Sequence, residues 1–358
     1  MAYSTNELSR QLFCLYATET LDKNNAVMGT IGAIKGCLAL YYDPGEEKKK
    51  FAEDSPCGIS LLSRAGNVGE LNEQFKDNIG TLIGISHFLH TVVKRGSNPK
   101  SIVPRINKWF AMNSEGEING VVNEDDIEYL DESKPVAMHV KSRFNGEWMF
   151  WFEDETPNEK FHLPGSDTTV VVMMNNSEIQ RVLVSDMEKE LEATVVQLPY
   201  RHNNGGFIAI MPDKPSNKED LVKLLSSLNL SNLLNSFSKD VACSTLKMPR
   251  FTTETNLMLD GPNSKPEEGL GRIEALKDFK KKAPNVFDGG IRNGVCLNLK
   301  TMVKNRARAK DIIADCDVEY SDCLPEDTRE IVFDKPMLYL VVDRNGYIII
   351  IGTLVKPE

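Results

Sequence analysis

The chain has 358 residues, which is enough for one large domain or two ordinary ones with a sizeable core. Apolar residues make up 41% and charged residues 26%, a composition typical of a globular protein rather than a disordered one. The net charge of −10 argues against general nucleic-acid binding. No stretch approaches the roughly eighteen apolar residues needed to cross a membrane.

The first third of the chain is predicted to be helical. Apolar residues three and four apart indicate helices over 7–20, 26–42, 69–76 and 80–95. In the first of these, Leu8, Leu12, Phe13 and Leu15 share one face. This segment lacks the basic, apolar and small-residue order of a signal peptide, so we expect a cytoplasmic protein unless a leader was removed before Met1.

From about residue 133 the pattern changes to short β-strands. Runs of β-branched and aromatic residues bounded by Gly, Asn and Pro occupy 134–152, 168–176, 193–200, 205–212 and 244–251. A Leu-rich helix with Asn217 as its cap and Asp220 in its first turn follows the fourth run, and a helix-like segment covers 265–279. Two final strands flank an Asn345-Gly346 hairpin turn. Helices first and strands later predict an α+β fold with a mostly antiparallel sheet.

The residues that usually carry catalysis or bind metals form no motif. Seven cysteines include no C-x-x-C pair, so we expect mostly buried free thiols, with one disulfide involving Cys316 or Cys323 as the alternative. His87 and His90 lie three apart on the predicted helix 80–95 but lack further metal ligands. There is no nucleophile elbow and no phosphate loop. We therefore expect no enzyme, no cofactor and no metal.

Several phrases, all in the same order, resemble the serpin family of serine protease inhibitors. They are INKWFAMNSEGEI at 106–118, FNGEWMFWF at 144–152, FHLPGSDTTVVVMM at 161–174, ATVVQLPYRHNNGGFIAIMPD at 193–213, LKMPRF at 246–251 and the last strands through Gly352 and Pro357. The resemblance is collinear from about residue 5 to residue 358. It implies a single domain, 1–358, with about nine helices around three mostly antiparallel sheets and an exposed reactive loop near the C-terminus. In inhibitory members the cleaved loop inserts into the central sheet as an extra strand.

The resemblance places the reactive loop after the strand phrase 297–311. The assigned loop residues are Asp317, Val318, Glu319, Tyr320, Ser321, Asp322, Cys323, Leu324, Pro325, Glu326, Asp327, Thr328, Arg329 and Glu330. The hinge near 316–321 has no glycine or alanine, although the family has a Gly-Thr-Glu and an alanine run there. Burying an unpaired carboxylate costs several kcal/mol, and overpacking with Val or Tyr costs about 1–3 kcal/mol more. The hinge chemistry therefore opposes insertion.

A second alignment of the hinge stays open, at 300–311. There Val303, Asn305, Ala307 and Ala309 face one side of a strand, and Lys304, Arg306, Arg308 and Lys310 face the other. This basic strip could bind an anionic polymer such as heparin, although a solvated strand face is the commoner reason for such a run.

The sheet-opening region also departs from the family. The family's Ser-Pro-x-Ser is replaced by a segment that contains Gly29, Thr30 and Gly32, and its asparagine before the Phe-x-Gly-x-Trp phrase is replaced by His139. The polar cluster that regulates opening of the sheet is therefore predicted to be dismantled.

These observations predict a non-inhibitory, monomeric protein of serpin fold that acts as a binding or regulatory module. Its expected partner is a protease or another protein ligand, with no nucleic acid and no membrane. The alternative is an inhibitor of a trypsin-like serine protease with Arg329 at the scissile position. Family habit favours secretion, on the condition that a leader was removed.

Overall fold

The computed structural model describes residues 5–19, 25–30, 57–64, 71–82, 88–113, 116, 120–128, 130, 136–143, 148–149, 152, 154–176, 180–201, 205–259, 297–307 and 328–357. The chain forms two compact units. Unit 1 comprises Met1–Glu19, Met28–Phe144 and Glu254–Lys304, and unit 2 comprises Thr20–Val27, Asn145–Thr253 and Asn305–Glu358. The expectation of one domain over 1–358 stays a prediction. Among the helices described, none is long and apolar enough to cross a membrane.

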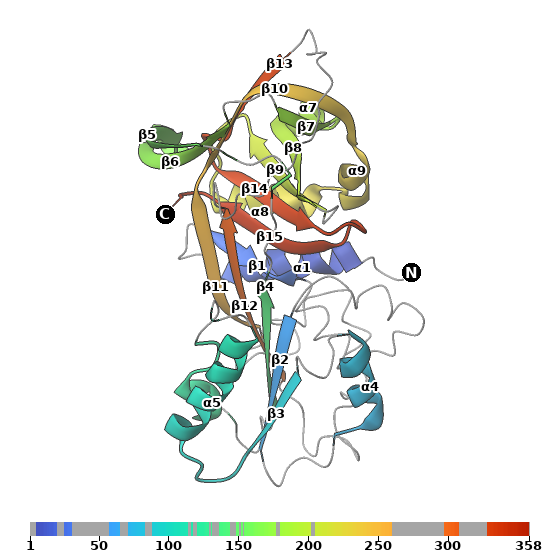
Figure 1. The fold of residues 1–358 in the computed structure, drawn as a ribbon, viewed down its shortest axis with the longest axis vertical. Helices are drawn as coiled ribbons and strands as arrows, with labels where there is room; N and C mark the ends of the chain where they lie inside the picture. The colour runs from blue at the N-terminus through green and yellow to red at the C-terminus, as the bar shows by residue number, and fades with distance from the viewer. Residues whose placement is uncertain are drawn as a thin grey trace. The chain divides into compact units, whose positions relative to one another are not determined.

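Unit 1 contains a five-stranded sheet in the order β11-β12-β4-β2-β3 (Figure 1). Its strands are β2 (Cys57–Arg64), β3 (Phe88–Val93), β4 (Val136–Arg143), β11 (Phe251–Leu259) and β12 (Leu297–Ala307), and its helices are α1 (Thr5–Glu19), α4 (Glu73–Leu82), α5 (Pro99–Met112) and α6 (Glu124–Glu128). An apolar cluster that includes Leu62, Val93, Ile106 and Phe110 joins α5 to the sheet. This cluster fixes the position of α5 beside β2 and β3.

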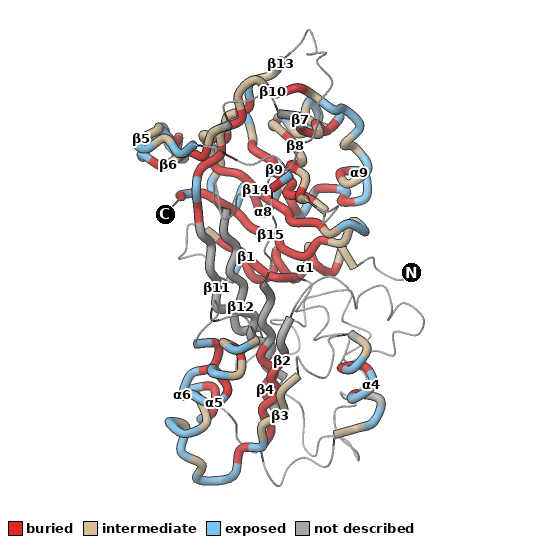
Figure 2. Tube along the Cα trace, viewed as in Figure 1, coloured by how far each residue is buried: buried red, intermediate tan, exposed pale blue. Residues whose placement is uncertain are grey.

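Unit 2 contains a ten-stranded sheet in the order β1-β15-β14-β9-β8-β7-β10-β6-β5, with β13 paired to β10. The strands are β1 (Ala26–Met28), β5 (Asp154–His162), β6 (Thr168–Asn176), β7 (Gln180–Ser185), β8 (Ala193–Pro199), β9 (Gly206–Pro212), β10 (Phe237–Pro249), β13 (Thr328–Val332), β14 (Met337–Val342) and β15 (Ile348–Leu354). The short helices are α7 (Glu188–Leu191), α8 (Lys218–Ser227), α9 (Leu230–Asn235) and a 3-10 turn at Pro164–Ser166. Every residue of β14 and β15 is buried, as the red tube in Figure 2 shows.

The α+β class is confirmed, and the number of helices in the described part of the chain is roughly consistent with the expectation. Hydrogen bonds join the described strands into two sheets rather than three, because β10 pairs with β7 along its first half and with β6 along its second. The hairpin is confirmed: β14 and β15 pair antiparallel, and Gly346 takes a φ of 78° in the turn. The cap is also confirmed, since Asn217 accepts a hydrogen bond from the Asp220 amide at 2.8 Å.

Two of the predicted helices were wrong where the structure describes them. Residues 26–28, at the start of the predicted helix 26–42, form strand β1. Residues 88–93, within the predicted helix 80–95, form strand β3, so His90 is a strand residue and His87 lies outside the described residues. The β-branched residues of β3 and its parallel pairing with β2 outweigh the helical spacing. The predicted helix 69–76 begins later, at Glu73, and the predicted helix 265–279 lies outside the described residues.

Candidate functional site

The strand that leads to the predicted loop is β12, and it lies directly beside β4. The two strands pair in parallel from Leu297 opposite Val136 to Lys304 opposite Arg143, with no strand between them. This pairing is called the β4/β12 seam below. The predicted basic residues Lys304 and Arg306 belong to β12, whereas Arg308 and Lys310 lie outside the described residues.

His139 of the predicted sheet-opening region lies in the seam, on β4. Its side chain is 2% exposed and its Nε2 lies 3.7 Å from Oδ1 of Asp126, which is also 2% exposed. Asp126 is held in place by Asn123, because each residue's side-chain oxygen accepts the other's backbone N–H, at 2.8 and 2.9 Å. A buried polar contact therefore links α6 to β4.

The remaining residues of that region lie elsewhere in the chain. Gly29 and Thr30 follow β1, and both are buried. Gly32 lies outside the described residues. Sequence reasoning missed Asp126, although the Asn-x-x-Asp spacing that begins α6 is a capping signal that could have found it.

The far end of the predicted loop belongs to strand β13. Thr328, Arg329 and Glu330 lie in this strand, which pairs in parallel with β10, while residues 317–327 lie outside the described residues. These three residues therefore belong to a sheet rather than to a loop. They are part of the register between β13 and β10, which runs on to Val332 opposite Lys247.

The Arg329 side chain is held by Glu188 of α7. Its Nη1 donates to Glu188 Oε2 at 2.7 Å and its Nη2 donates to Glu188 Oε1 at 3.0 Å. Glu188 Oε1 also accepts the backbone N–H of Val195 at 3.0 Å, so the carboxylate is fixed from a second side. Two parallel, charge-assisted bonds of this kind are strong and orient both side chains. Sequence reasoning did not find Glu188, which is 141 residues from Arg329 and carries no local signal.

A free cysteine lies under the same strand. Cys243 of β10 stands opposite Arg329 in the register, is buried, and donates its thiol to the Thr245 carbonyl at 2.9 Å. Burial raises the pKa of the Cys243 thiol, which keeps it protonated and unreactive. Cys14 is also free, and Cys316 and Cys323 lie outside the described residues. No group of three or more metal-ligating side chains occurs among the residues described.

Aromatic residues from several of the resembling phrases meet in the core of unit 2. Trp148 stacks on Tyr200 at 5.0 Å between ring centroids and meets Phe207 edge-on at 5.7 Å. Phe207 in turn stacks on Tyr339 at 5.4 Å. The ring of Tyr339 lies against Gly352, where an added Cβ would come within 2.1 Å of it. Three of the phrases, namely 144–152, 193–213 and the last strands, thus contribute to one packed cluster.

The sequence matches the family model described as Serpin (serine protease inhibitor) over residues 67–357. The chain belongs to the serpin family. It is similar to Serpin-Z10 of Arabidopsis thaliana, with 22% identity over 73% of this chain and 67% of the relative. It also resembles the solved structures of Serpin48 from Tenebrio molitor, with a TM-score of 0.71 and 15% identity, and of human thyroxine-binding globulin complexed with thyroxine, with a TM-score of 0.70 and 16% identity. Each comparison covers 99% of this serpin and 97% of the other chain, and at these identities it shows the fold alone.

Proposed function

We propose that this serpin is a binding or regulatory protein that does not trap proteases and is not itself an enzyme. The observation that carries the proposal is that the side chain of Arg329 is engaged in an ion pair. Arg329 is the only basic residue between Asp317 and Glu330 in the sequence. A trypsin-like protease must take an exposed basic side chain into its specificity pocket. Arg329 is instead paired with Glu188 and incorporated in β13, so cleavage there requires breaking the ion pair and detaching the strand.

The β4/β12 seam and the hinge sequence support the same proposal. Insertion of a strand must separate the paired residues from Leu297 to Lys304 on one side and from Val136 to Arg143 on the other. The hinge would bring Asp317 and Glu319 into that position, and a buried carboxylate without a partner costs several kcal/mol. Thyroxine-binding globulin, one of the structural neighbours, is named for binding a small molecule, and we extend a binding role of this general kind to the present chain.

A second candidate is an inhibitor that is cleaved before Thr328 by a protease of another specificity. One observation favours it: residues 314–320 alternate, with Ala314, Cys316, Val318 and Tyr320 at the even positions and acidic residues at 315, 317 and 319. Apolar side chains on one face only are what a half-buried strand requires.

One experiment separates the two candidates. The protein is incubated with trypsin-like, chymotrypsin-like and elastase-like serine proteases, and the products are resolved on a denaturing gel. Our proposal predicts no covalent complex and no large rise in melting temperature after the chain has been nicked. A complex that survives denaturation, together with a strongly raised melting temperature of the nicked protein, would establish the inhibitor instead.

The role of the ion pair is tested separately with Glu188→Ala. Removal of the carboxylate frees the Arg329 side chain, so trypsin should cut after Arg329 faster than in the unaltered protein, and the product should be an ordinary cleaved substrate. Asp240→Ala is the matched control, because Asp240 of β10 forms an exposed ion pair with Arg181 of the neighbouring strand β7. Equal cleavage rates after Arg329 in both variants would show that the ion pair does not protect Arg329 from trypsin. A monomeric, secreted protein remains part of the proposal, and light scattering checks the monomer.

A further inference from the structure

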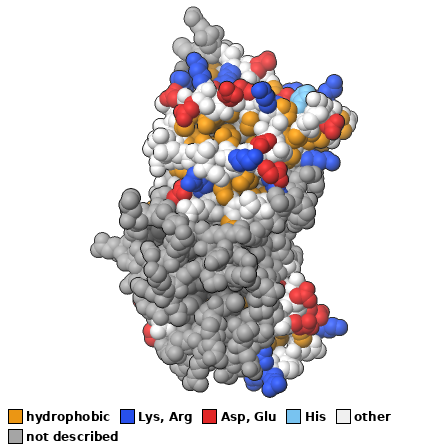
Figure 3. Space-filling model, turned by 180° about the vertical axis from the view of Figure 1, so that it is seen from behind, with side chains coloured by type: hydrophobic (Ala, Val, Ile, Leu, Met, Phe, Trp, Pro, Cys, Tyr) orange, Lys and Arg blue, Asp and Glu red, His pale blue; other side chains and the backbone are white. Residues whose placement is uncertain are grey.

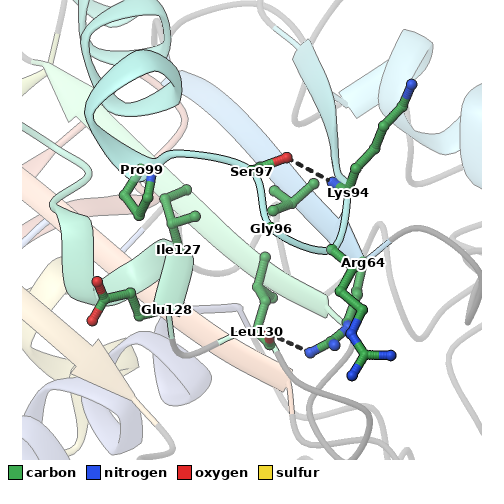
Figure 4. Close-up of a pocket in the computed structure, with 10 residues that line it drawn as sticks. Arg64, Lys94, Gly96, Ser97, Pro99, Ile127, Glu128 and Leu130 are labelled. Atoms are coloured by element: carbon green, nitrogen blue, oxygen red, sulfur yellow. Dashed lines mark hydrogen bonds between the residues drawn. The ribbon is translucent and has the colours of Figure 1, made fainter.

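A cavity of about 260 Å³ lies in unit 1, between the end of β2, the turn that follows β3 and helix α6 (Figure 4). At about 30 Å³ for each molecule of liquid water, this volume equals that of about nine waters. It therefore suits a molecule of roughly nine non-hydrogen atoms. Pockets for drug-sized ligands are larger, at about 300–1,000 Å³. The cavity is called the Arg64 cavity below.

One side of the Arg64 cavity is apolar. Val93, Ile127 and Leu130 line it, and they are 6%, 4% and 5% exposed. All three belong to the apolar cluster that joins α5 to the sheet of unit 1, so packing within that cluster fixes their position. The apolar part of a ligand that lies here leaves water without a rearrangement of the protein, which favours binding.

Another side of the cavity carries the guanidinium of Arg64. Its Nη1 donates to the Leu130 carbonyl at 2.9 Å, and this bond holds the side chain in one orientation (Figure 4). A guanidinium has five N–H donors, and Arg64 forms no ion pair within the part of the chain that the structure describes. Two further donors of the guanidinium would serve a bidentate carboxylate. Arg64 is thus an oriented cation to which a ligand could supply the countercharge.

The other charges around the cavity also favour an anion. Lys94 and Arg95 of the turn line it, and Glu128 of α6 is the one carboxylate among its described lining residues. Figure 4 shows the Lys94 side chain directed out of the cavity and the Glu128 carboxylate on the side opposite Arg64. In the space-filling view, Lys and Arg side chains and Asp and Glu side chains form separate groups at the lower end of the picture (Figure 3). The cations at the mouth attract an anion, and repulsion by Glu128 keeps its charge on the Arg64 side.

Backbone amides of the turn and of the start of α5 are already used, which limits the kind of anion. The Lys94 N–H donates to the Ser97 hydroxyl at 3.1 Å, and the Ser97 N–H donates to the Lys94 carbonyl at 3.0 Å. The Asn98 side chain accepts the N–H of Lys100 at 3.0 Å, and Pro99 has no N–H. A phosphate or sulfate group is usually bound by several such amides, whereas one guanidinium satisfies a carboxylate.

We propose that the Arg64 cavity binds a small amphipathic carboxylate, about the size of a single-ring aryl carboxylate, with its charge on the guanidinium and its apolar part on the apolar side. The proposal rests on the binding role proposed above and gives that role a site and a class of ligand. The two fail separately, because protease trapping is read on a denaturing gel and occupation of the cavity is read by titration.

The first test is a calorimetric titration of the full chain with three probes. Benzoate has the proposed size and charge, benzamide keeps the ring without the charge, and acetate keeps the charge without the ring. Benzamide and acetate should each bind at least about tenfold more weakly than benzoate, because the charged hydrogen bonds and the burial of the ring each contribute at least that factor. Equal binding of either probe would overturn the proposal, as would displacement of benzoate by a lower concentration of inorganic phosphate.

Three variants test the guanidinium. Arg64→Gln should weaken benzoate binding about 10- to 100-fold, and Arg64→Lys should recover part of the loss because it keeps the charge without the bidentate geometry. Arg105→Gln is the matched control: it makes the same change of charge at an exposed position of α5 that does not line the cavity, and should bind benzoate as the unaltered protein does. Circular dichroism and thermal melting establish that each variant is folded. Unchanged affinity in the folded Arg64→Gln protein would contradict the proposed role of the guanidinium.

A further measurement locates benzoate on the unaltered protein and so does not depend on a variant. In methyl NMR spectra, the signals of Val93, Ile127 and Leu130 should shift as benzoate is added. Those of Ile208 and Ile351, which are buried in unit 2, should not. Shifts in unit 2 without shifts at the three cavity residues would place benzoate elsewhere and overturn the proposal.

Discussion

Replacing Arg329 with alanine should loosen β13 from the sheet of unit 2. The side chain makes two charge-assisted hydrogen bonds to Glu188, at 2.7 and 3.0 Å, and the two side chains are 35% and 21% exposed. After truncation, Glu188 keeps the Val195 N–H as a donor but loses its countercharge. The strand keeps its backbone pairing with β10, so the effect should be local.

The size of the effect follows from the partial burial. Exposed ion pairs contribute about 0.2–1 kcal/mol, and removing one partner of a fully buried pair costs about 3–5 kcal/mol. A bidentate pair about one third exposed on the arginine side lies between these limits, so we expect Arg329→Ala to cost about 1.5–2 kcal/mol after allowance for solvent screening. The coupling energy between the two side chains should be about 1 kcal/mol.

A double-mutant cycle with Arg329→Ala and Glu188→Gln measures that coupling by denaturant unfolding, and hydrogen exchange of the Ile331 amide reports the opening of β13 directly. Arg181 and Asp240 provide the control, because they form a single bond at 2.9 Å with side chains 45% and 49% exposed. Their cycle should give less than about 0.5 kcal/mol.

Additive effects of the two changes at Arg329 and Glu188 would refute the reasoning. An unchanged hydrogen-exchange rate of the Ile331 amide in the Arg329→Ala protein would refute it as well. The backbone pairing alone would then keep β13 in the sheet, without a contribution from the ion pair. Arg329→Lys gives a finer check: it keeps the charge but not the bidentate geometry, and should recover about half of the loss.

Three other predictions concern groups that are partly or fully buried. Burial lowers the pKa of His90 from 6.5. Below about pH 6.5 the unfolded chain therefore binds a proton that the folded chain lacks, so the free energy of unfolding should fall as the pH drops through this range. The variant His90→Gln should flatten the pH dependence of the melting temperature. Cys243 should react with iodoacetamide at pH 8 far more slowly than the half-buried Cys14, as peptide mass mapping would show, because its thiol is buried with a raised pKa; equal labelling would contradict this. Gly352→Ala should cost about 3 kcal/mol in urea unfolding, since its Cβ would overlap the buried Tyr339 ring, and a neutral result would mean that the ring moves aside.

The strands that sequence reasoning recovered are those with local signals. The final hairpin was predicted because Asn345-Gly346 sits between two apolar runs, and the turn alone fixes the pairing. Strand β3 was missed because the residues before and within it are apolar at both helical and strand spacing, so only its pairing with β2 decides its structure.

The same distinction holds for the candidate site. The collinear phrases carry the resemblance to the family, but the ion pair of Arg329 depends on a carboxylate far away in the chain. Only tertiary structure brings such residues together. The contact between His139 and Asp126 likewise depends on how α6 meets β4, which no local pattern specifies.

The order of strands in unit 2 has a consequence for biosynthesis. Strand β14 lies between β9 and β15, and both β14 and β15 are translated after every other strand of that sheet. Until they emerge from the ribosome, β9 offers an unpaired and apolar edge that can pair with another nascent chain. A message truncated before codon 337 should therefore yield aggregates rather than a weakened protein, and holdase chaperones should be needed late in translation rather than early.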